Sequence, residues 1–407
     1  MNCRHCNHGL THVFCDLQTC PPSNAMVKPE MINYPETYFP LKVFVCEKCW
    51  LVQVDELEKA DAIFNSEYTY FSSYSTSWLQ HAKEYTEYMT KRFDYDENSL
   101  VVEVASNDGY LLQYFKEKNI PVLGVEPTAN TAEVAKQKGI ESIVDFFGSR
   151  LANEHLKGKA DLILGNNVLA HVPDINDFVK GVKTTLKPNG VNTFEFPHLL
   201  QLVAQNQFDT IYHEHFSYLS LTNLVSVFKK QGLEIFDVQE LPTHGGSLRI
   251  FTKHKEDNSK PIEPVVADML QKEKDAGMVT LEYYQGFQAK VDKIKYDFIG
   301  FLIEQKRAGK KVIGYGAAAK GNTLLNYCGI KGNDLIQFVV DASPFKQNKL
   351  LPGARIPVVA KEEIEKYKPD YIIIFPWNLK TEITEQLAYT REWGAKFVIA
   401  VPHLQFY

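Results

Sequence analysis

Short apolar runs separated by amphipathic stretches recur through the middle of the chain. Five of these runs lie at residues 99–105, 122–127, 141–146, 160–164 and 191–196. Segments 111–115 and 131–138, which lie between them, have helical spacing. Strands that alternate with helices predict a parallel sheet, which binds its ligands at the carboxyl ends of the strands. Two later runs, 233–238 and 247–252, predict a pair of strands that closes this sheet.

A second alternation of the same kind fills the C-terminal part of the chain. Residues 311–323 have the pattern of a strand, a glycine turn and the start of a helix. Further strands are predicted at 335–341, 371–375 and 396–401. Between the two sheets, residues 261–307 are charged and carry apolar residues at helical spacing, which predicts one or two long helices. The pattern therefore predicts an α/β protein whose second sheet is smaller and Rossmann-like.

The N-terminal part differs from the rest because it concentrates the cysteines. Of the 7 cysteines, all but one lie in the first 49 residues. Two CxxC knuckles, Cys3 with Cys6 and Cys46 with Cys49, each place two thiolates on one tight turn. Together they predict a tetrahedral zinc site with four sulfur ligands, which is structural because no position stays open for water. Possible substitute ligands are Cys15, Cys20, His5 and His8.

The bulk composition narrows the class of protein. A chain of 407 residues is too long for one ordinary core, so two or three domains are expected. The net charge of -6 argues against non-specific nucleic-acid binding, which needs a cationic surface. No apolar run reaches about 18 residues, so we expect no membrane span. The N-terminus lacks the apolar core of a signal peptide, and we expect a soluble, cytoplasmic protein.

The turn after the first central strand is the candidate cofactor site. It lacks GxGxxG, so the dinucleotide fingerprint is absent. Gly109 allows close approach of a ligand to the backbone, and Glu126 ends the next strand, where an acid can bind both hydroxyls of a ribose. The set resembles the S-adenosylmethionine methyltransferase fold, and its candidate residues are Glu103, Ser106, Asn107, Gly109, Glu126 and Asn167. Phe147, in the segment 145–147 after the third strand, is expected to meet the adenine.

Residues 212–215 concentrate reactive side chains. Tyr212, His213, Glu214 and His215 bring a phenol, two imidazoles and a carboxylate together, and these groups exchange protons near neutral pH. The stretch follows the fifth strand and is therefore an insertion at the ligand edge of the sheet. Its location, more than its composition, predicts a catalytic role.

The glycine turn of the C-terminal sheet is a candidate phosphate site. The backbone amides of this turn, including that of Gly316, precede a helix whose first turn carries Lys320 and Asn322. Together they form a suitable binding site for a pyrophosphate. Asp341, at the end of the next strand, is suited to a ribose. A sheet that serves only a structural role is the alternative. A second nucleotide site beside a methyl-donor site suggests a substrate that carries a nucleotide.

Five motifs occur in the order of a known family. They are the two CxxC knuckles, residues 104–109 (VASNDG), 212–215 (YHEH), 243–249 (THGGSLR) and 314–321 (GYGAAAKG). With them the whole chain resembles the nucleotide-sugar C-methyltransferases that make branched-chain deoxysugars. The resemblance implies a zinc-binding module at 1–66, an S-adenosylmethionine-binding domain at 67–256, and a helical linker with a nucleotide-sugar-binding domain at 257–407. Family substrates are dTDP-linked or related 4-keto-6-deoxyhexoses, usually methylated at C3.

The resemblance also implies roles for the reactive stretch. His215 is the candidate base that removes the C3 proton, Tyr212 supports the enolate or the base, and Glu214 orients the site. An enolate beside the C4 ketone forms only if it is stabilised, and its carbon then attacks the methyl group in line. Tyr68 matches the family's N-terminal active-site tyrosine, with Tyr70 and Tyr74 as alternatives, and His213 is assigned to the scaffold. His244 and Arg249 contact the substrate, unless the motif serves only a hairpin.

Three other functions fit parts of the sequence. An O- or N-methyltransferase acting on a related sugar needs the same cofactor site but no carbon acid. A nucleic-acid methyltransferase is disfavoured by the acidic balance and by the absence of basic-aromatic patches. A non-catalytic zinc- and nucleotide-binding sensor or scaffold is disfavoured by the intact Tyr, His and Glu cluster. A small-molecule nucleotide sugar is thus the expected partner, with a monomer as the default oligomeric state.

Overall fold

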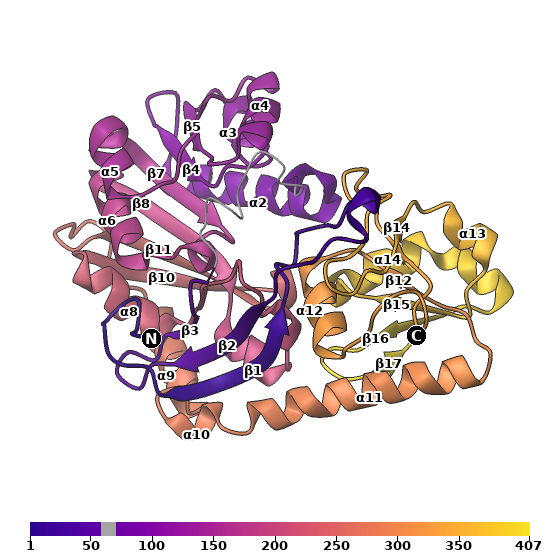
Figure 1. Ribbon diagram of the computed structural model, residues 1–407. Helices are drawn as coiled ribbons and strands as arrows, with labels where there is room; N and C mark the ends of the chain where they lie inside the picture. Colours follow the sequence, from indigo (N-terminus) through magenta and orange to yellow (C-terminus); the bar gives the residue numbers. More distant parts are fainter. Residues whose placement is uncertain (58–70) are drawn as a thin grey trace.

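The computed structural model describes residues 1–57 and 71–407, and these residues form three sheets (Figure 1). Tyr68 and Tyr70, two of the tyrosines considered for the active site, lie outside the described residues. The N-terminal sheet, the central sheet and the C-terminal sheet correspond to three parts of the chain. Helix α11 runs along the base of the C-terminal part (Figure 1).

The N-terminal sheet takes one of its four strands from the central part of the chain. Its order is β1-β2-β3-β9, and every pairing is antiparallel. The strands are β1 (His12–Cys20), β2 (Phe39–Val45), β3 (Val52–Val54) and β9 (Ser217–Tyr218). Strand β9 follows the reactive stretch 212–215 directly, and Val52 of β3 pairs with Tyr218. The zinc-binding part and the reactive stretch are therefore joined by backbone pairing.

The five central apolar runs are confirmed as strands of one seven-stranded sheet, in the order β10-β11-β8-β7-β4-β5-β6. The strands are β4 (Val101–Val104), β5 (Val122–Val125), β6 (Ser142–Ile143), β7 (Ala160–Asn166), β8 (Leu186–Pro197), β10 (Leu233–Leu241) and β11 (Ser247–His254). The first five are parallel, whereas β10 and β11 form the antiparallel pair that closes the sheet against β8.

Helices cover both faces of this sheet, which explains why its strands are rich in apolar residues. The helices of the central part are α2 (Thr76–Phe93), α3 (Leu112–Glu117), α4 (Ala129–Gln137), α5 (Ser149–Leu151), α6 (Ile175–Thr185), α7 (Leu199–Ala204) and α8 (Leu221–Lys230). Val101 packs into the cluster beneath α2 and α3, and the next residue, Val102, packs into the cluster beneath α6 and α8. Each such fully buried aliphatic side chain contributes about 1.5–3 kcal/mol.

The C-terminal sheet is the second Rossmann-like sheet that the pattern predicts. Its order is β14-β13-β12-β15-β16-β17, parallel except for the last pair. The strands are β12 (Val312–Tyr315), β13 (Val339–Val340), β14 (Val358–Val359), β15 (Tyr371–Ile374), β16 (Lys396–Ile399) and β17 (Gln405–Phe406). The helices are α12 (Ala319–Tyr327), α13 (Glu363–Tyr367) and α14 (Lys380–Gln386).

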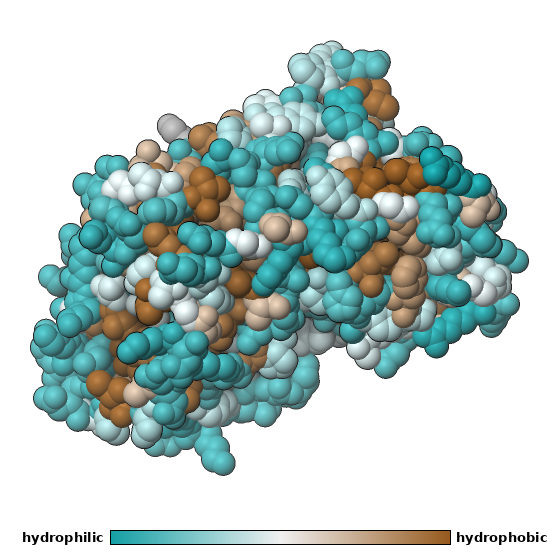
Figure 2. Space-filling view, turned by 90° about the horizontal axis from the view of Figure 1, so that it is seen from below, coloured by the Kyte–Doolittle hydropathy of each residue, from teal (hydrophilic) through white to brown (hydrophobic). Residues whose placement is uncertain are grey.

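The predicted helical linker is confirmed as α9 (Pro264–Asp275), α10 (Leu281–Tyr284) and the long α11 (Phe287–Arg307). Helix α9 packs Val266 and Met269 into the core of the central part, and α11 packs Phe298 into the C-terminal core. Hydrophilic residues cover most of the face seen in Figure 2, with hydrophobic ones in small groups. Among the described residues, no helix combines the length and apolar character needed to cross a bilayer.

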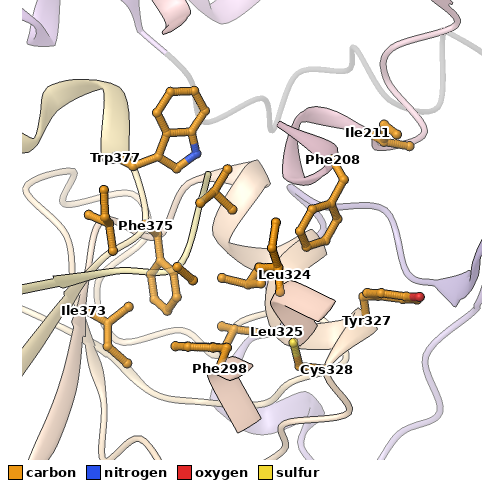
Figure 3. Close-up of a cluster of buried hydrophobic side chains, with 14 of the residues drawn as sticks. Phe208, Ile211, Phe298, Leu324, Leu325, Tyr327, Cys328, Ile373, Phe375 and Trp377 are labelled. Carbon is orange, nitrogen blue, oxygen red and sulfur yellow. The ribbon is translucent and has the colours of Figure 1, made fainter. Parts of the chain in front are cut away.

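Helix α12 is the element against which the reactive stretch is docked. Phe208 stacks edge-on against Tyr327 at a ring-centroid distance of 5.8 Å, and it lies beside Leu324 in the buried cluster (Figure 3). The Thr323 hydroxyl of α12 donates to the carbonyl oxygen of Ile211 at 3.0 Å. The segment that leads into residues 212–215 is thus held between the central and C-terminal parts.

Candidate active site

The four knuckle cysteines come together as the sequence predicts. Their sulfur atoms all lie within 4.8 Å of one another. Tetrahedral zinc with Zn–S bonds of about 2.3 Å requires sulfur atoms about 3.8 Å apart, so the cluster fits the ion. Gln53 donates from Nε2 to the Cys3 Sγ atom at 3.2 Å, and this hydrogen bond orients that ligand. Cys3, Cys6, Cys46 and Cys49 thus form a cluster suited to bind zinc, and four sulfur ligands leave no position open for water.

The substitute ligands considered from the sequence are engaged elsewhere. His5 bonds to Asn176 and to Ser226, and the nearest acidic partner of His8 is Glu47. The thiols of Cys15 and Cys20 are buried in the hydrophobic core that underlies β1. None of these four side chains belongs to the sulfur cluster.

A cavity of about 570 Å³ lies at the carboxyl edge of the central sheet. One wall carries the turns after β4, β5 and β7, and another carries residues 210–215. The start of α12 supplies the third wall, and Figure 1 shows this helix between the central and C-terminal sheets. The cavity therefore lies where the topology of an open α/β sheet places its ligands.

The cofactor wall is built by two unusual turn residues and a buried acid. Asn107 and Gly109 have φ of +49° and +74°, and a Cβ added at Gly109 would meet the Ile140 Cδ1 atom at 2.6 Å. The Glu126 carboxylate accepts from the amide of Asn107 at 2.8 Å and from the amide of Thr128 at 2.9 Å. Burial raises the pKa of Glu126, although these hydrogen bonds oppose the shift.

The residues of this wall fit a polar, nucleoside-like ligand. Among the predicted cofactor residues, Asn107, Glu126, Phe147 and Asn167 line the cavity. The side-chain amide of Asn166, which also lines it, is buried and has no hydrogen-bond partner among the described residues, and neither has the Oδ1 atom of Asn167. Unpaired buried polar atoms beside a cavity are suited to bind a ligand.

Three predicted cofactor residues lie behind the wall instead of in it. Glu103, Ser106 and Gly109 do not line the cavity. Burial raises the pKa of Glu103 well above its ordinary value. Asp145, expected near the adenine, instead accepts a hydrogen bond from Arg150 at 2.5 Å on the surface.

His215 is held in one tautomer. Its Nδ1 atom lies 2.8 Å from the carbonyl oxygen of Thr210. A carbonyl only accepts, so Nδ1 carries the proton and Nε2 is the basic nitrogen. Burial lowers the pKa of His215 well below its ordinary value, and the nearby His171 acts in the same direction. The ring is therefore a neutral imidazole at pH 7, with the Tyr212 ring 4.0 Å away and the His171 ring 4.6 Å away.

The other members of the reactive stretch divide as the sequence expects. Tyr212 and Glu214 line the cavity, whereas His213 does not. The Nε2 atom of His213 lies 3.2 Å from the Pro40 carbonyl oxygen, and its ring rests edge-on against Phe39. His213 thus fastens the stretch to the N-terminal sheet.

Lys320, near the start of α12, also lines the cavity. Its Nζ atom donates to Asn378 Oδ1 at 2.8 Å and lies 4.5 Å from the centre of the Trp377 ring. Burial lowers the pKa of Lys320, while the charge of Asp209 raises it. Asp209 accepts from the Trp377 indole at 2.7 Å, and burial raises the pKa of its carboxyl to about 6. Ala318 and Ala319 place the amino end of α12 beside Lys320.

Of the predicted substrate residues, His244 and Lys320 line the cavity, while Gly316, Asn322, Asp341 and Arg249 do not. The His244 Nε2 atom accepts from Asn167 at 2.6 Å. Arg249 of β11 is buried opposite Glu195 of β8 and donates to its carboxylate at 2.7 Å. Asp341 accepts from the amide of Ala317 at 2.7 Å, so it shapes the glycine turn instead of facing a ligand.

Several residues that line the cavity have no role in the sequence analysis, among them Asn24, Trp78, His171 and Lys346. His171 follows the fourth central strand, at the same edge of the sheet as the turns predicted to bind ligands. Its position in the sequence could therefore have identified it. Trp78 lies on α2 among other aromatic residues and has the appearance of a core residue. Asn24 and Lys346 come from segments without regular pattern, and only the tertiary fold brings them to the cavity.

Three family models match successive parts of the chain. They are described as a zinc binding domain over residues 3–64, a methyltransferase domain over 77–238 and a C-methyltransferase C-terminal domain over 242–402. The C-methyltransferase NovU of Streptomyces niveus is 35% identical over 404 residues, which span 98% of this chain and 95% of NovU.

Solved structures resemble the chain more distantly. YcgJ of Bacillus subtilis is 14% identical and covers 44% of this chain and 100% of its own, with a TM-score of 0.36. Magnesium protoporphyrin IX methyltransferase of Synechocystis, solved with bound S-adenosylmethionine, is 13% identical and covers 43% of this chain and 78% of its own, with a TM-score of 0.34. TM-scores this low do not establish a shared fold. By its match to NovU along nearly its whole length, the chain belongs to the C-methyltransferase family and is an S-adenosylmethionine-dependent enzyme.

Proposed function

We propose that this enzyme methylates carbon C3 of a nucleoside-diphosphate-linked 4-keto-6-deoxyhexose. The observation that carries the proposal is His215, a neutral imidazole whose Nδ1 proton is fixed by Thr210. It shares one cavity with Glu126, on the cofactor wall, and with Lys320, near the start of α12. A base between a methyl donor and an anion-binding wall is what methylation of a carbon acid requires.

In this proposal, His215 removes the C3 proton of the substrate through Nε2. The electron pair of the broken C–H bond moves into the C3–C4 bond as the C4 ketone becomes an enolate. Tyr212, whose ring lies against His215, donates a hydrogen bond to the developing oxyanion, and Glu214 orients the reacting sugar. When bound, S-adenosylmethionine supplies the electrophilic methyl group that C3 attacks. Tyr68 remains a candidate second tyrosine.

Binding of the two ligands is divided between the walls. Asn107, Glu126, Phe147 and Asn167 hold S-adenosylmethionine, with Glu126 directed to the ribose and Phe147 to the adenine. Lys320 and the amino end of α12 hold the pyrophosphate of the substrate, because a cation and unpaired amides both favour an anion. His244 contacts the sugar from the side of Asn167.

The domain boundaries and the cellular location belong to the same proposal. We assign zinc binding to residues 1–66, S-adenosylmethionine binding to 67–256 and nucleotide-sugar binding to 257–407. A biosynthetic enzyme with four reduced cysteines on zinc is suited to the cytoplasm.

Hydrogen exchange tests the carbon acid directly. In D₂O, without the methyl donor, the wild-type enzyme should exchange the C3 proton of a dTDP-4-keto-6-deoxyhexose, as followed by NMR. His215→Ala should lose exchange and methyl transfer by at least about 100-fold and still bind both ligands. His213→Ala, a matched change two residues away, should retain both activities.

The outcomes separate the candidate functions. An O- or N-methyltransferase would show no exchange, and its methyl group would appear on oxygen or nitrogen in the product. A binding protein without activity would show neither exchange nor product. An active His215→Ala enzyme would remove His215 from the role of base.

A further inference from the structure

Asn24 belongs to the N-terminal part of the chain, yet it lines the catalytic cavity. It lies in the segment between β1 and β2, outside both strands. Its Nδ2 atom donates to the Glu214 Oε1 atom at 2.7 Å. An amide nitrogen can only donate, so it stabilises the ionised carboxylate, and it does so without adding charge to the cavity.

The segment that carries Asn24 is anchored on the C-terminal part. Val27 and Leu350 exchange two backbone hydrogen bonds, of 2.9 Å and 2.8 Å. Further along, Glu36 accepts from the amide of Gly353 at 2.7 Å and from the Arg355 Nε atom at 2.6 Å. The position of Asn24 therefore depends on contacts with the C-terminal part, whereas Glu214 belongs to the central part of the chain.

We propose that Asn24 is a positioning residue that holds the Glu214 carboxylate in its working orientation once the C-terminal part is docked. The inference rests on the proposed function, because it assigns to Glu214 a role in orienting the sugar. The N-terminal part, which carries the zinc-binding cysteines, thereby contributes a residue to the cavity wall formed by the reactive stretch 212–215. Through Asn24, the anchored segment makes the orientation of Glu214 depend on contacts with the C-terminal part.

Replacing Asn24 by an aspartate gives a readout that a purely structural role would not. Two carboxyl groups about 2.7 Å apart resist ionising together, so one proton is shared and one pKa rises. Below that raised pKa the Asn24→Asp variant regains a donor to Glu214, and above it the two charges repel. The variant leaves the other titratable groups that line the cavity unchanged: Tyr110, Glu126, His171, Asp174, Asp177, Tyr212, His215, His244, Lys320 and Lys346.

We expect kcat of Asn24→Asp to approach the wild-type value near pH 5.5 and to fall progressively as the pH rises to 8. Asn24→Ala should lower kcat about 10- to 100-fold at every pH and leave the affinity for S-adenosylmethionine unchanged. Asn33→Asp is the matched control, because Asn33 is exposed on the same segment and the change adds the same charge. This control should keep the wild-type pH profile.

The result that overturns the inference is an Asn24→Asp enzyme with the pH profile of Asn33→Asp. If Asn24→Asp does not fold, Asn24→Ala decides: an unchanged kcat overturns the inference, and a reduced kcat with normal S-adenosylmethionine affinity supports it. A wild-type enzyme that neither exchanges nor methylates any 4-keto sugar would instead overturn the proposed function. The two failures are therefore distinguishable.

Discussion

At the scale of single residues, the site combines groups whose charge is set by burial. His215 is kept neutral by desolvation and by the neighbouring His171. Desolvation also lowers the pKa of His244, to about 4. Lys320 lines the same cavity, and its charge also lowers the pKa of His215. A neutral base and a lysine in one cavity suit a substrate that carries both an acidic C–H bond and a diphosphate.

The lowered pKa of His215 predicts the acid limb of the pH profile. The base acts in its unprotonated form, so activity falls only as the pH drops through the folded-state pKa, which lies well below 6.5. The rate of C3 exchange should therefore change by less than about 20% between pH 7.5 and 6.5, whereas an unperturbed histidine would lose nearly half of its base form over the same range. An acid limb centred near pH 6.5 would contradict the assignment of His215 as the base. The control variant His213→Ala should show the same acid limb as the wild-type enzyme.

At the scale of elements, α9 and α8 are joined by one buried acid. The Glu273 side chain is fully buried on α9 and accepts from the amides of Leu221 and Thr222 at 2.7 Å each. It also lies 2.7 Å from the His198 Nε2 atom. Burial alone would raise the pKa of Glu273, but its partners outweigh this effect and lower the pKa.

Loss of this carboxylate should destabilise the fold. Glu273→Ala leaves His198 and two amides without their partner, and we expect a loss of about 3 kcal/mol in the free energy of unfolding by urea. Asp268→Ala, at an exposed position of α9, should cost less than about 0.5 kcal/mol. Because the folded-state pKa of Glu273 is lowered, its contribution is complete above the unfolded-state value and is lost as the pH falls through the folded-state value. Equal stability of the two variants would contradict this account.

The elements that the sequence predicts are those with long repeating patterns. The strands around residues 102, 123 and 163 are buried on both faces, so their apolar runs stand out, and CxxC spacing alone locates the zinc ligands. The two-residue strand β9 has no periodicity, and its pairing with β3 is a long-range contact. Arg249 and Asp341 were assigned to the substrate because the pattern gives their strands but not the faces on which the side chains lie.

At the scale of the whole molecule, the zinc site supports the catalytic wall through the N-terminal sheet. The knuckle between β2 and β3 holds Cys46 and Cys49, and β3 pairs with β9 immediately after Glu214 and His215. His213 adds a second contact, to Pro40. Order in the metal site is therefore transmitted to the reactive stretch by backbone pairing.

Removal of zinc should therefore reduce catalysis, although the metal site does not touch the reacting groups. Cys49→Ser should lose bound zinc, measured by atomic emission, lower the midpoint of thermal unfolding by several degrees, and reduce C3 exchange at least about tenfold. Cys328→Ala, which changes a buried cysteine outside the cluster, should retain the metal and the activity. A zinc-free Cys49→Ser enzyme with full exchange activity would show that the N-terminal sheet does not support the site.

The pairing of β3 with β9 also has a consequence for biosynthesis. The ribosome delivers β1, β2 and β3 early, but β9 emerges only after five strands of the central sheet have been made. Until then the nascent sheet has an exposed strand edge, which favours association with other chains. Because both CxxC knuckles lie in the first 49 residues, zinc can hold β1, β2 and β3 together before β9 has been synthesised. Zinc supply during translation should therefore determine how much chain escapes aggregation.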